Sequence, residues 1–548
     1  LKPKKRSKTK NNFLKLISYL SAKYIKPAHM RYLVSVLFLS LALSSFGQTT
    51  WADDVATIFY QKCSKCHNPN GIAPFSLVTY SEVSPMAGAI YDAVNQDRMP
   101  PWPPNNDYQQ YIHNRELDAA DKILVLDWLT NGAPEGNASN TPPPPAFPTD
   151  ALLGAGDLEL QIPTYMSKAQ SGQDDYVCFS LPTGLTQGRD IKSVEIIPGN
   201  RSIVHHALVY IDPDGSSFTD TVGGDCASPS SQNSVLVTGY TPGATPMTLP
   251  TVSPMKLGIP LPANSKIVLA MHYPDGSYGE YDSTRVIFHF YPPGTTGIRT
   301  VYAAPLLSNW FFALPPNQMT DLTATYPNSG TINLEASILS VFPHMHLIGQ
   351  SIKAYGLDPS NDTIPLIDIP HWDFHWQDFY WFKHAQHFEI GSSMKAEATY
   401  NNTTSNPHNP NNPPQWVGPG ENTTDEMMLV YFHFMGYQPG DELYDLEQLM
   451  QQATLTELPE DESGLKVYPN PSSSDFHLSM KNFPNAEDFQ IRIYDTQGKL
   501  VRDWKNVPSA QNWVWDGKSN DGAETMKGIY ILSANIGGSF YSTRLIRF

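Results

Sequence analysis

The chain has 548 residues, which at about 150 residues per domain predicts three or four domains. Only 16% of the residues are charged, whereas 48 prolines, 36 glycines and an aromatic content of 11% favour β-sheets joined by turns over helical bundles. The formal net charge of −17 argues against nucleic acid as a partner. The only basic run, Lys2–Lys10, lies before the apolar run at residues 32–43 and so outside the expected mature chain.

An export signal is predicted within residues 1–47. Residues 32–43 form an apolar run that is too short to span a bilayer comfortably, and small and polar residues follow it. Met30 stands just before this run, so we expect Met30 to be the true start of the precursor, with residues 1–29 an upstream read-through or an extension of the signal. The mature protein is expected to begin near Gln48, outside the cytoplasm. No later segment reaches about 18 apolar residues, so no transmembrane segment is expected in the mature chain. An uncleaved signal anchor is the alternative.

Residues 50–135 are predicted to form a small α-helical domain. Acidic residues open its first helix, and a last helix is indicated by the spacing of Leu117, Ala120, Leu124 and Trp128. Near its start lies the run Cys63-Ser64-Lys65-Cys66-His67. In such a C-x-x-C-H motif two thioethers hold haem c covalently and the histidine binds the iron. An unmetallated redox pair or half of a zinc site is the alternative.

The sixth iron ligand is expected to be Met99, because the prolines after it would hold its loop rigid across the haem. Met86 and His113 are the competing ligands. With these features the domain resembles a class I cytochrome c, and a Met/His pair of ligands suits electron transfer rather than oxygen chemistry. Residues 136–152, which contain the proline run of Thr141–Pro148, are predicted to be a stiff linker.

Residues 153–440 are predicted to form two β-sandwich domains, 153–297 and 298–440. Short alternating apolar runs, such as Ser202–Tyr210 and Ser265–Tyr273, are typical of strands, and turn residues separate them. Cys178 and Cys226 lie outside the haem motif, and we expect this even pair to form a disulfide in an oxidising compartment. The whole chain is therefore expected to be multidomain and mainly β.

Histidines cluster in this β-rich region. His205 and His206 are adjacent in a predicted strand, so their side chains would leave opposite faces unless a bulge intervenes. His344 and His346 have the period-two spacing that places both side chains on one face, as a pair of metal ligands requires. His272 stands alone at a strand end, where a purely structural role is the alternative.

The order of these histidines, followed by Asp425-Glu426-Met427, resembles the copper type II, ascorbate-dependent monooxygenases. That family includes the peptidylglycine α-hydroxylating and dopamine β-hydroxylating enzymes. The resemblance implies two jelly-roll-like domains, two copper ions, an external reductant such as ascorbate, and a disulfide that flanks the first histidine pair. It implies that an electron-transfer copper is bound by His205, His206 and His272. It implies that a second copper, where oxygen is activated, is bound by His344, His346 and Met427, with Tyr431 in the active site.

The chemistry of these residues agrees with that assignment, because imidazoles suit both copper oxidation states and a thioether favours Cu(I). Three positions depart from the peptide-hydroxylating members. Phe342 stands where those enzymes have an arginine that binds the substrate carboxylate. Leu429 stands in place of a polar residue, and Ala270 in place of a glutamine. A C-terminal glycine peptide is therefore not the expected substrate, and a more apolar one is. Met428 is rejected as a ligand because strand alternation turns it to the other face. The other histidines are expected to be structural: His371, His375, His384, His387, His408 and His433.

Residues 441–463 are acidic and are predicted to be a linker to a β-rich block at 464–548. The runs Val467–Pro471, Ile493–Lys499 and Gly528–Leu532 resemble the C-terminal sorting domain of type IX secretion substrates, a small β-sandwich. An adhesive or carbohydrate-binding module is the alternative. The resemblance implies the type IX secretion machinery as a partner, passage through the periplasm of a Gram-negative bacterium, and a secreted or cell-surface protein.

Together these features predict a secreted copper-dependent monooxygenase whose electrons enter through the haem domain. The enzyme would use O2, an electron donor and a small-molecule or peptide-like substrate, and it would hydroxylate a C–H bond. Two other functions stay open. One is a haem and copper protein for electron transfer or copper storage, and the other is a surface binding protein without chemistry.

Overall fold

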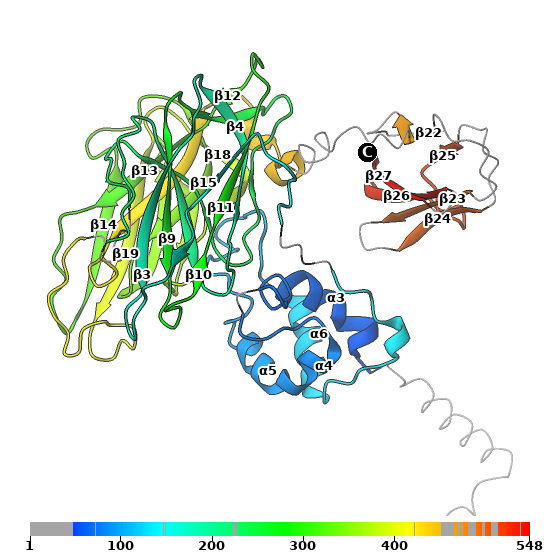
Figure 1. The fold of residues 1–548 in the computed structure, drawn as a ribbon, viewed down its shortest axis with the longest axis horizontal. Helices are drawn as coiled ribbons and strands as arrows, with labels where there is room; N and C mark the ends of the chain where they lie inside the picture. The colour runs from blue at the N-terminus through cyan, green and yellow to red at the C-terminus, as the bar shows by residue number, and fades with distance from the viewer. Residues whose placement is uncertain are drawn as a thin grey trace, which may run out of the picture. The chain divides into compact units, whose positions relative to one another are not determined.

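A computed structural model describes residues 48–548, apart from 72, 146, 148–149, 223–225, 227, 421, 451–464, 469–471, 473–474, 481–488, 496–498, 506–512, 537–538 and 548. The predicted export signal, residues 1–47, lies outside the described residues. The chain divides into two compact units (Figure 1), of which the first contains residues up to Trp102 and Arg115–Phe147. The second contains Pro103–Asn114 and the chain from Pro148 onwards. In the part of the chain that is described, no helix has the length and apolarity needed to cross a membrane.

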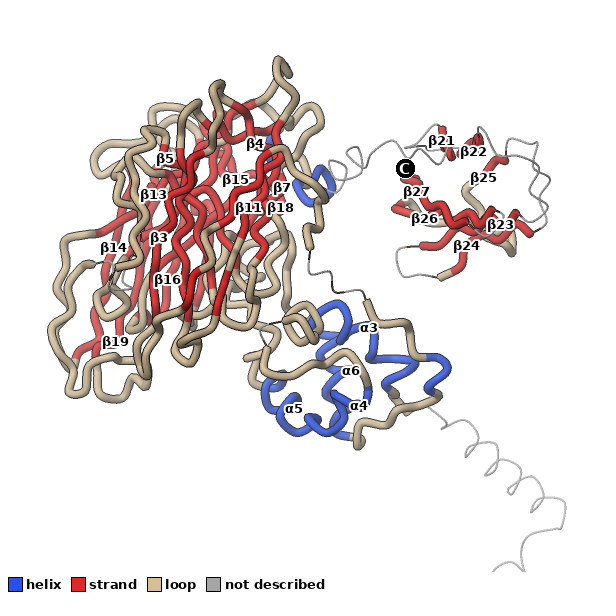
Figure 2. The backbone as a smooth tube through the Cα atoms, viewed as in Figure 1, coloured by secondary structure: helices blue, strands red, loops and turns tan. Residues whose placement is uncertain are grey.

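The first unit is helical, as predicted, and Figure 2 shows its helices in blue. Its helices are Trp51–Cys63, in which α3 (Ala56–Ile58) is flanked by π-helical turns, α4 (Tyr80–Val83), α5 (Ala87–Asn95) and α6 (Ala119–Thr130). Polar side chains cap the starts of these helices: Thr50 accepts from the backbone N–H of Asp53, and Asp118 from that of Asp121. Three aromatic side chains form the centre of the core: Trp51, Phe59 and Trp128.

The boundary of this unit differs from the predicted domain 50–135, because Pro103–Asn114 belongs to the second unit. The backbone N–H of Ile112 donates to the carbonyl of Trp381 (2.9 Å), and that of Asn105 donates to the carbonyl of Asp368 (2.8 Å). The buried Tyr111 hydroxyl donates to the carbonyl of Leu366 (2.8 Å). The sequence between the two parts of the first unit is therefore an extra edge segment of the second unit.

The second unit is mainly β, and its first half has two large sheets together with a two-stranded sheet, β10-β2. The sheet orders are β1-β11-β4-β8-β12, with β7 beside β4, and β3-β9-β5-β6. Their side chains form a shared apolar core, for example Val177, Ile191, Val209 and Phe288. The strands are β1 (Leu158–Gln161), β2 (Tyr165–Met166), β3 (Asp175–Pro182), β4 (Arg189–Ile197), β5 (His206–Asp212), β6 (Val235–Tyr240), β7 (Met247–Thr248), β8 (Leu257–Leu261), β9 (Lys266–Tyr273), β10 (Tyr281–Asp282), β11 (Arg285–Phe290) and β12 (Arg299–Thr300).

The second half also has two sheets, β13-β20-β15-β18 and β14-β19-β16-β17. These sheets approach closely at Gly356 in β16, where an added Cβ would lie 2.4 Å from the ring of Phe388 in β18. Only glycine leaves room for that ring. The strands are β13 (Tyr302–Asn309), β14 (Gln318–Tyr326), β15 (Ala336–His344), β16 (Gly349–Leu357), β17 (Thr363–Ile369), β18 (Tyr380–Phe388), β19 (Ser393–Asn402) and β20 (Met428–Gly436).

The two halves share one core, in which β15, β18 and β20 contribute Leu339, Trp381 and Met435 beside residues of the first half. Buried His433 joins the halves, because its Nε2–H donates to the carbonyl of Val237 in β6 (2.9 Å) while its Nδ1 accepts from Ser340 (2.7 Å). The prediction that His433 is structural is therefore confirmed. The predicted acidic linker at 441–463 begins too early, since Leu446 and Met450 pack into the same core. Its remainder, 451–463, lies outside the described residues.

The C-terminal block has a three-stranded sheet, β21-β22-β25, and a four-stranded sheet, β24-β23-β26-β27. Residues of both sheets form one apolar core, for example Phe476, Trp515, Ile491 and Leu532, as a β-sandwich requires. The strands are β21 (Leu465–Tyr468), β22 (Phe476–Met480), β23 (Phe489–Asp495), β24 (Leu500–Lys505), β25 (Trp513–Trp515), β26 (Gly528–Ile536) and β27 (Ser539–Arg547).

A buried ion pair fixes the end of the second half and yields a prediction about stability. Asp441, 2% exposed, accepts from both terminal nitrogens of Arg299 (2.7 and 2.6 Å) and from the hydroxyl of Ser337 (2.7 Å). We expect Asp441→Asn to lower the free energy of unfolding by about 1–3 kcal/mol at pH 7, because it leaves the partly buried Arg299 without its anion. Urea denaturation measures this loss, with Asp107→Asn at an exposed position as the control.

The loss should depend on pH. Burial opposes ionisation of Asp441, but the bonds from Arg299 and Ser337 outweigh it and hold the pKa of this carboxyl below its usual value. The stabilisation is therefore complete above the unfolded-state pKa of about 3.9 and is lost as the pH falls through the folded-state pKa. The difference between wild type and Asp441→Asn should shrink below about pH 4, and equal stabilities at pH 7 would contradict the assignment.

Candidate functional site

Three histidines of the first half converge on one point. β5 begins at His206 and pairs with β9, where His272 is the direct partner of His206. His205 lies just before the strand, and its backbone N–H donates to the carbonyl of His272 (3.0 Å). The predicted alternation of His205 and His206 therefore does not apply, because the strand starts one residue later. The Nδ1 atom of His206 lies 3.3 Å from that of His205 and 3.2 Å from that of His272.

This arrangement fits a metal ion. With metal–nitrogen bonds of about 2.0–2.1 Å, such separations correspond to ligand angles of about 105°. The Nε2–H of His272 donates to Asp174 (2.8 Å), which leaves its Nδ1 lone pair free for a metal. Burial lowers the pKa of His205 to about 3 and also lowers the pKa of His206 and His272, so all three imidazoles are neutral near pH 7. Neutral imidazoles are the form that binds metal ions.

A second pair of histidines lies at the end of β15. The rings of His344, the last residue of the strand, and His346 are 5.1 Å apart between centroids, so the prediction that they share one side holds. The Nδ1–H of His344 donates to the side-chain oxygen of Gln377, and that of His346 donates to the carbonyl of Asp425 (3.1 Å). Both Nε2 atoms are thereby left as acceptors. Burial lowers the pKa of His344 to about 3 and that of His346 to about 4, so both rings are neutral.

Met427 immediately precedes β20 and is tied to the second pair through Glu426. The buried Glu426 carboxylate accepts from the backbone N–H groups of His346 (2.8 Å), Ile348 (2.8 Å) and Met427 (3.2 Å). Burial raises the pKa of Glu426 to about 8, although these N–H donors favour the ionised form. Glu426 is thus a positioning residue that sequence reasoning did not assign. Its position next to Met427 is the only signal in the sequence, and its burial and its bonds to the loop of His346 appear only in the structure.

One cavity of about 250 Å3 connects the two groups of residues. Its lining includes His206 from the first cluster together with His344, His346, Met427 and Tyr431. Phe342, Leu429 and Ala270, the three positions that depart from the peptide-hydroxylating enzymes, line it as well. Met428, the rejected ligand, is buried but does not line this cavity. Four of the six predicted copper ligands therefore lie on the cavity wall, and His205 and His272 cluster with His206 beside it.

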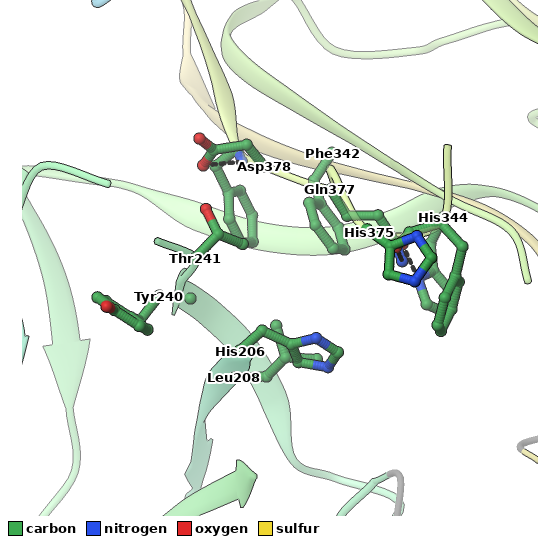
Figure 3. Close-up of a pocket in the computed structure, with 12 residues that line it drawn as sticks. His206, Leu208, Tyr240, Thr241, Phe342, His344, His375, Gln377 and Asp378 are labelled. Atoms are coloured by element: carbon green, nitrogen blue, oxygen red, sulfur yellow. Dashed lines mark hydrogen bonds between the residues drawn. The ribbon is translucent and has the colours of Figure 1, made fainter. Parts of the chain in front are cut away.

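A smaller cavity of about 30 Å3 lies between the two groups (Figure 3). His206 and Leu208 approach it from one side, and His344, His375 and Gln377 from the other. The ring of His375 stands 5.5 Å from that of His205, and its Nδ1 is 2.9 Å from a carboxylate oxygen of Asp373.

His375 was predicted to be structural, but it lies next to a predicted copper ligand rather than in the core. The bond to Asp373 raises the pKa of His375 and outweighs the opposite effect of burial. Gln377 was not singled out either. Both residues belong to the loop between β17 and β18, and no sequence spacing links that loop to the histidine pairs.

The predicted haem-attachment motif sits at the end of the first helix. The backbone N–H of His67 donates to the carbonyl of Cys63 (3.0 Å), so one helical turn brings the two thiols and the imidazole together. Cys63 and Cys66 are not joined in a disulfide, and burial raises the pKa of Cys63 to about 12. The Nδ1–H of His67 donates to the carbonyl of Phe75 (3.0 Å), which leaves Nε2 available for an iron. These residues fit a covalently held haem.

The structure does not bring the predicted sixth ligand of the haem iron, Met99, into one cavity with His67. Met99 is 37% exposed and lines a cavity of about 40 Å3 with Trp102 and Leu117, and His67 does not line that cavity. Met86 is half-buried against the helical core, and His113 belongs to the segment of the second unit. Met99 as an axial ligand stays a prediction.

The expected disulfide is present. Cys178 in β3 and Cys226 are bonded, with their Cα atoms 5.6 Å apart. Cys226 also lines the large cavity, so this bond fixes part of the cavity wall.

Comparison with known proteins supports part of this assignment. Residues 304–456 match the family model of the copper type II ascorbate-dependent monooxygenase, C-terminal domain. Residues 466–547 match the model of the secretion system C-terminal sorting domain, which indicates export followed by secretion or attachment to the cell surface. No curated protein matches the chain significantly.

Solved structures add little. PorZ, a surface component of the type-IX secretion system of Porphyromonas gingivalis, is 16% identical over 23% of this chain, with a TM-score of 0.14. Latent PorU from the same organism is 12% identical over 68% of this chain, also with a TM-score of 0.14. This chain covers 14% of the PorZ chain and 34% of the PorU chain, and such TM-scores carry no argument. The family models, in contrast, describe a secreted protein with a copper monooxygenase-like domain that contains His344, His346 and Met427.

Proposed function

We propose that the chain is a secreted copper-dependent monooxygenase that hydroxylates a C–H bond of its substrate with O2. The observation that carries the proposal is a cavity that reaches two donor sets: its wall includes His206, one of three clustered imidazoles in the first half, and two imidazoles with the Met427 thioether in the second half. The family match of residues 304–456 supports the same chemistry for the second set.

The residues of the chain have distinct tasks in this proposal. His205, His206 and His272 would hold one copper ion, and His344, His346 and Met427 the other. Copper bound there supplies one-electron redox chemistry and activates O2. Asp174 and Gln377 fix the ring orientation and tautomer of His272 and His344. Tyr431 lies on the cavity wall with Met427.

The helical unit would serve as the entry point for electrons. Cys63 and Cys66 would hold haem c by two thioether bonds and His67 would bind its iron, with Met99 as the proposed sixth ligand. A bound haem c supplies single electrons. The external reductant, ascorbate or another donor, would reduce this unit.

Copper and oxygen measurements test the proposal. We expect two copper ions and one haem per exported chain, and O2 uptake that requires both a reductant and a substrate. A protein that binds copper and is reduced but shows no substrate-dependent O2 uptake would instead be an electron-transfer or copper-storage protein. A protein that carries haem but binds no copper would be a surface binding protein.

The haem assignment gives a separate prediction. Replacing both thiols, Cys63→Ser with Cys66→Ser, should remove the covalent haem, because the thioether bonds need both sulfurs. Mass spectrometry of the denatured chain should show the added mass of haem in the wild type and not in the variant. Copper content should stay at two per chain. Wild-type protein exported from a host that can attach haem, yet without this added mass, would contradict the assignment.

A further inference from the structure

The large cavity has an unusual lining for a site of this size. None of its described lining residues is Asp, Glu, Lys or Arg, and the only ionisable nitrogen groups on it are the three histidines His206, His344 and His346. A ligand that carries a charge would therefore lose part of its hydration in this cavity without gaining a carboxylate, ammonium or guanidinium partner from the described lining residues.

Apolar and aromatic side chains form much of the wall. Phe342 is 4% exposed and stacks on Phe379, with 4.6 Å between ring centroids, and it also lies 6.1 Å from the Tyr431 ring. Leu429 and Trp310 line the cavity beside them. At about 30 Å3 per water molecule, the volume of about 250 Å3 holds roughly eight waters, which is the space of a small organic molecule.

Two hydroxyl groups on the wall are buried without a hydrogen-bond partner among the described residues. They are the Oη of Tyr176, whose ring stacks on His272 at 4.3 Å, and the Oγ of Ser234. Leaving a buried hydroxyl group unpaired costs free energy. A ligand that forms a hydrogen bond with one of these hydroxyls removes that cost and so binds more tightly. A neutral hydroxyl, ether or carbonyl group supplies that partner.

We infer that the substrate is an uncharged small molecule with an apolar or aromatic body and a neutral hydrogen-bonding group. This inference rests on the proposed function, since it names the substrate class of that site. The body would pack against Phe342, Leu429 and Trp310, and the neutral polar group would bond to Tyr176 or Ser234. The reacting C–H bond would then face the side of the cavity formed by His344, His346 and Met427.

Binding to the copper-free full chain tests the inference apart from catalysis. The probes share one apolar body and differ in their end group: 4-phenylbutan-1-ol, 4-phenylbutanoate and 4-phenylbutan-1-amine, with butylbenzene as the hydrocarbon. Calorimetry at pH 7 should show the alcohol binding at least about 10-fold more tightly than the acid and the amine, because burying a charge without a partner is costly. Equal or tighter binding of the acid or the amine would overturn the inference.

A variant pair tests the polar contact. Ser234→Ala together with Tyr176→Phe should weaken binding of the alcohol by about 10-fold and leave butylbenzene unchanged, since one neutral hydrogen bond is lost. Ser329→Ala, an exposed serine away from the cavity lining, is the control and should change neither. Unchanged binding of the alcohol in the double variant would overturn the assigned contact. The comparison of the alcohol, the acid, the amine and butylbenzene uses the wild-type chain, so it does not depend on whether a variant folds.

The two proposals fail in different ways. If the alcohol binds as expected but the copper-loaded protein takes up no O2 with any neutral compound, the substrate-class inference about the cavity stands and the oxygenase proposal fails. If the copper-loaded protein takes up O2 only with charged compounds, the oxygenase proposal stands and the inference is overturned.

Discussion

Met427→Leu should reduce substrate-dependent O2 uptake by at least about 100-fold. The exchange conserves side-chain volume, so it removes the sulfur without emptying the site. A soft thioether favours Cu(I), and even the loss of a residue that only orients a ligand commonly costs 10–100-fold in affinity or activity. Oxygen-electrode assays under saturating reductant measure this loss, and copper analysis should show the first copper retained.

The adjacent methionine provides a matched control. Met428 is also buried, opens β20 and does not line the cavity. Met428→Leu is the same chemical change one residue away, and it should keep at least half of the wild-type activity. Full activity in Met427→Leu, or an equal loss in both variants, would contradict the assignment of Met427.

His206→Ala should lower the copper content from two ions to one per chain. His206 is the central member of the first cluster, since its Nδ1 lies within 3.3 Å of the Nδ1 atoms of both His205 and His272. Without it, only two imidazoles remain for that ion, and steady-state O2 uptake should fall by at least about 100-fold. The measurement is copper per chain by elemental analysis together with the uptake assay.

The control for this variant is His408→Ala, an exposed histidine outside both cavities. It should retain two copper ions and wild-type uptake. A His206→Ala protein that still binds two copper ions would show that the first cluster is not a copper site.

Much of the site was predictable because its signals are local. The period-two spacing of His344 and His346 predicts that they share one side, and their rings lie 5.1 Å apart although β15 already ends at His344. His272 was expected at a strand end, and it occupies the penultimate position of β9. The geometry of the C-x-x-C-H motif was also predictable, since one helical turn joins Cys63 to His67.

The parts that sequence reasoning missed depend on contacts between distant segments. His205 and His206 converge because β5 starts at His206, and strand pairing rather than the local sequence sets that start. Glu426 ties the loop of His346 to Met427 through backbone N–H groups, which a sequence pattern does not reveal. His375 reaches His205 from a segment 170 residues later in the chain.

The domain boundaries were misjudged for a similar reason. Residues 103–114 are rich in polar residues and prolines and carry no strand pattern, yet the Tyr111 hydroxyl and the backbone of Ile112 bond to strands more than 250 residues away. The acidic character of 441–463 also concealed Leu446 and Met450, whose burial in the core extends the second half beyond residue 440. In both segments, contacts with residues distant in the sequence determine where the domain ends.

Isotope labelling tests the central claim most directly. The copper-loaded, reduced protein is incubated under 18O2 with neutral aromatic alcohols, and the products are analysed by mass spectrometry. A copper monooxygenase should yield a hydroxylated product that contains one 18O atom from O2 and that disappears when copper is removed. A product whose oxygen comes from water, or O2 uptake without any labelled product, would contradict the account.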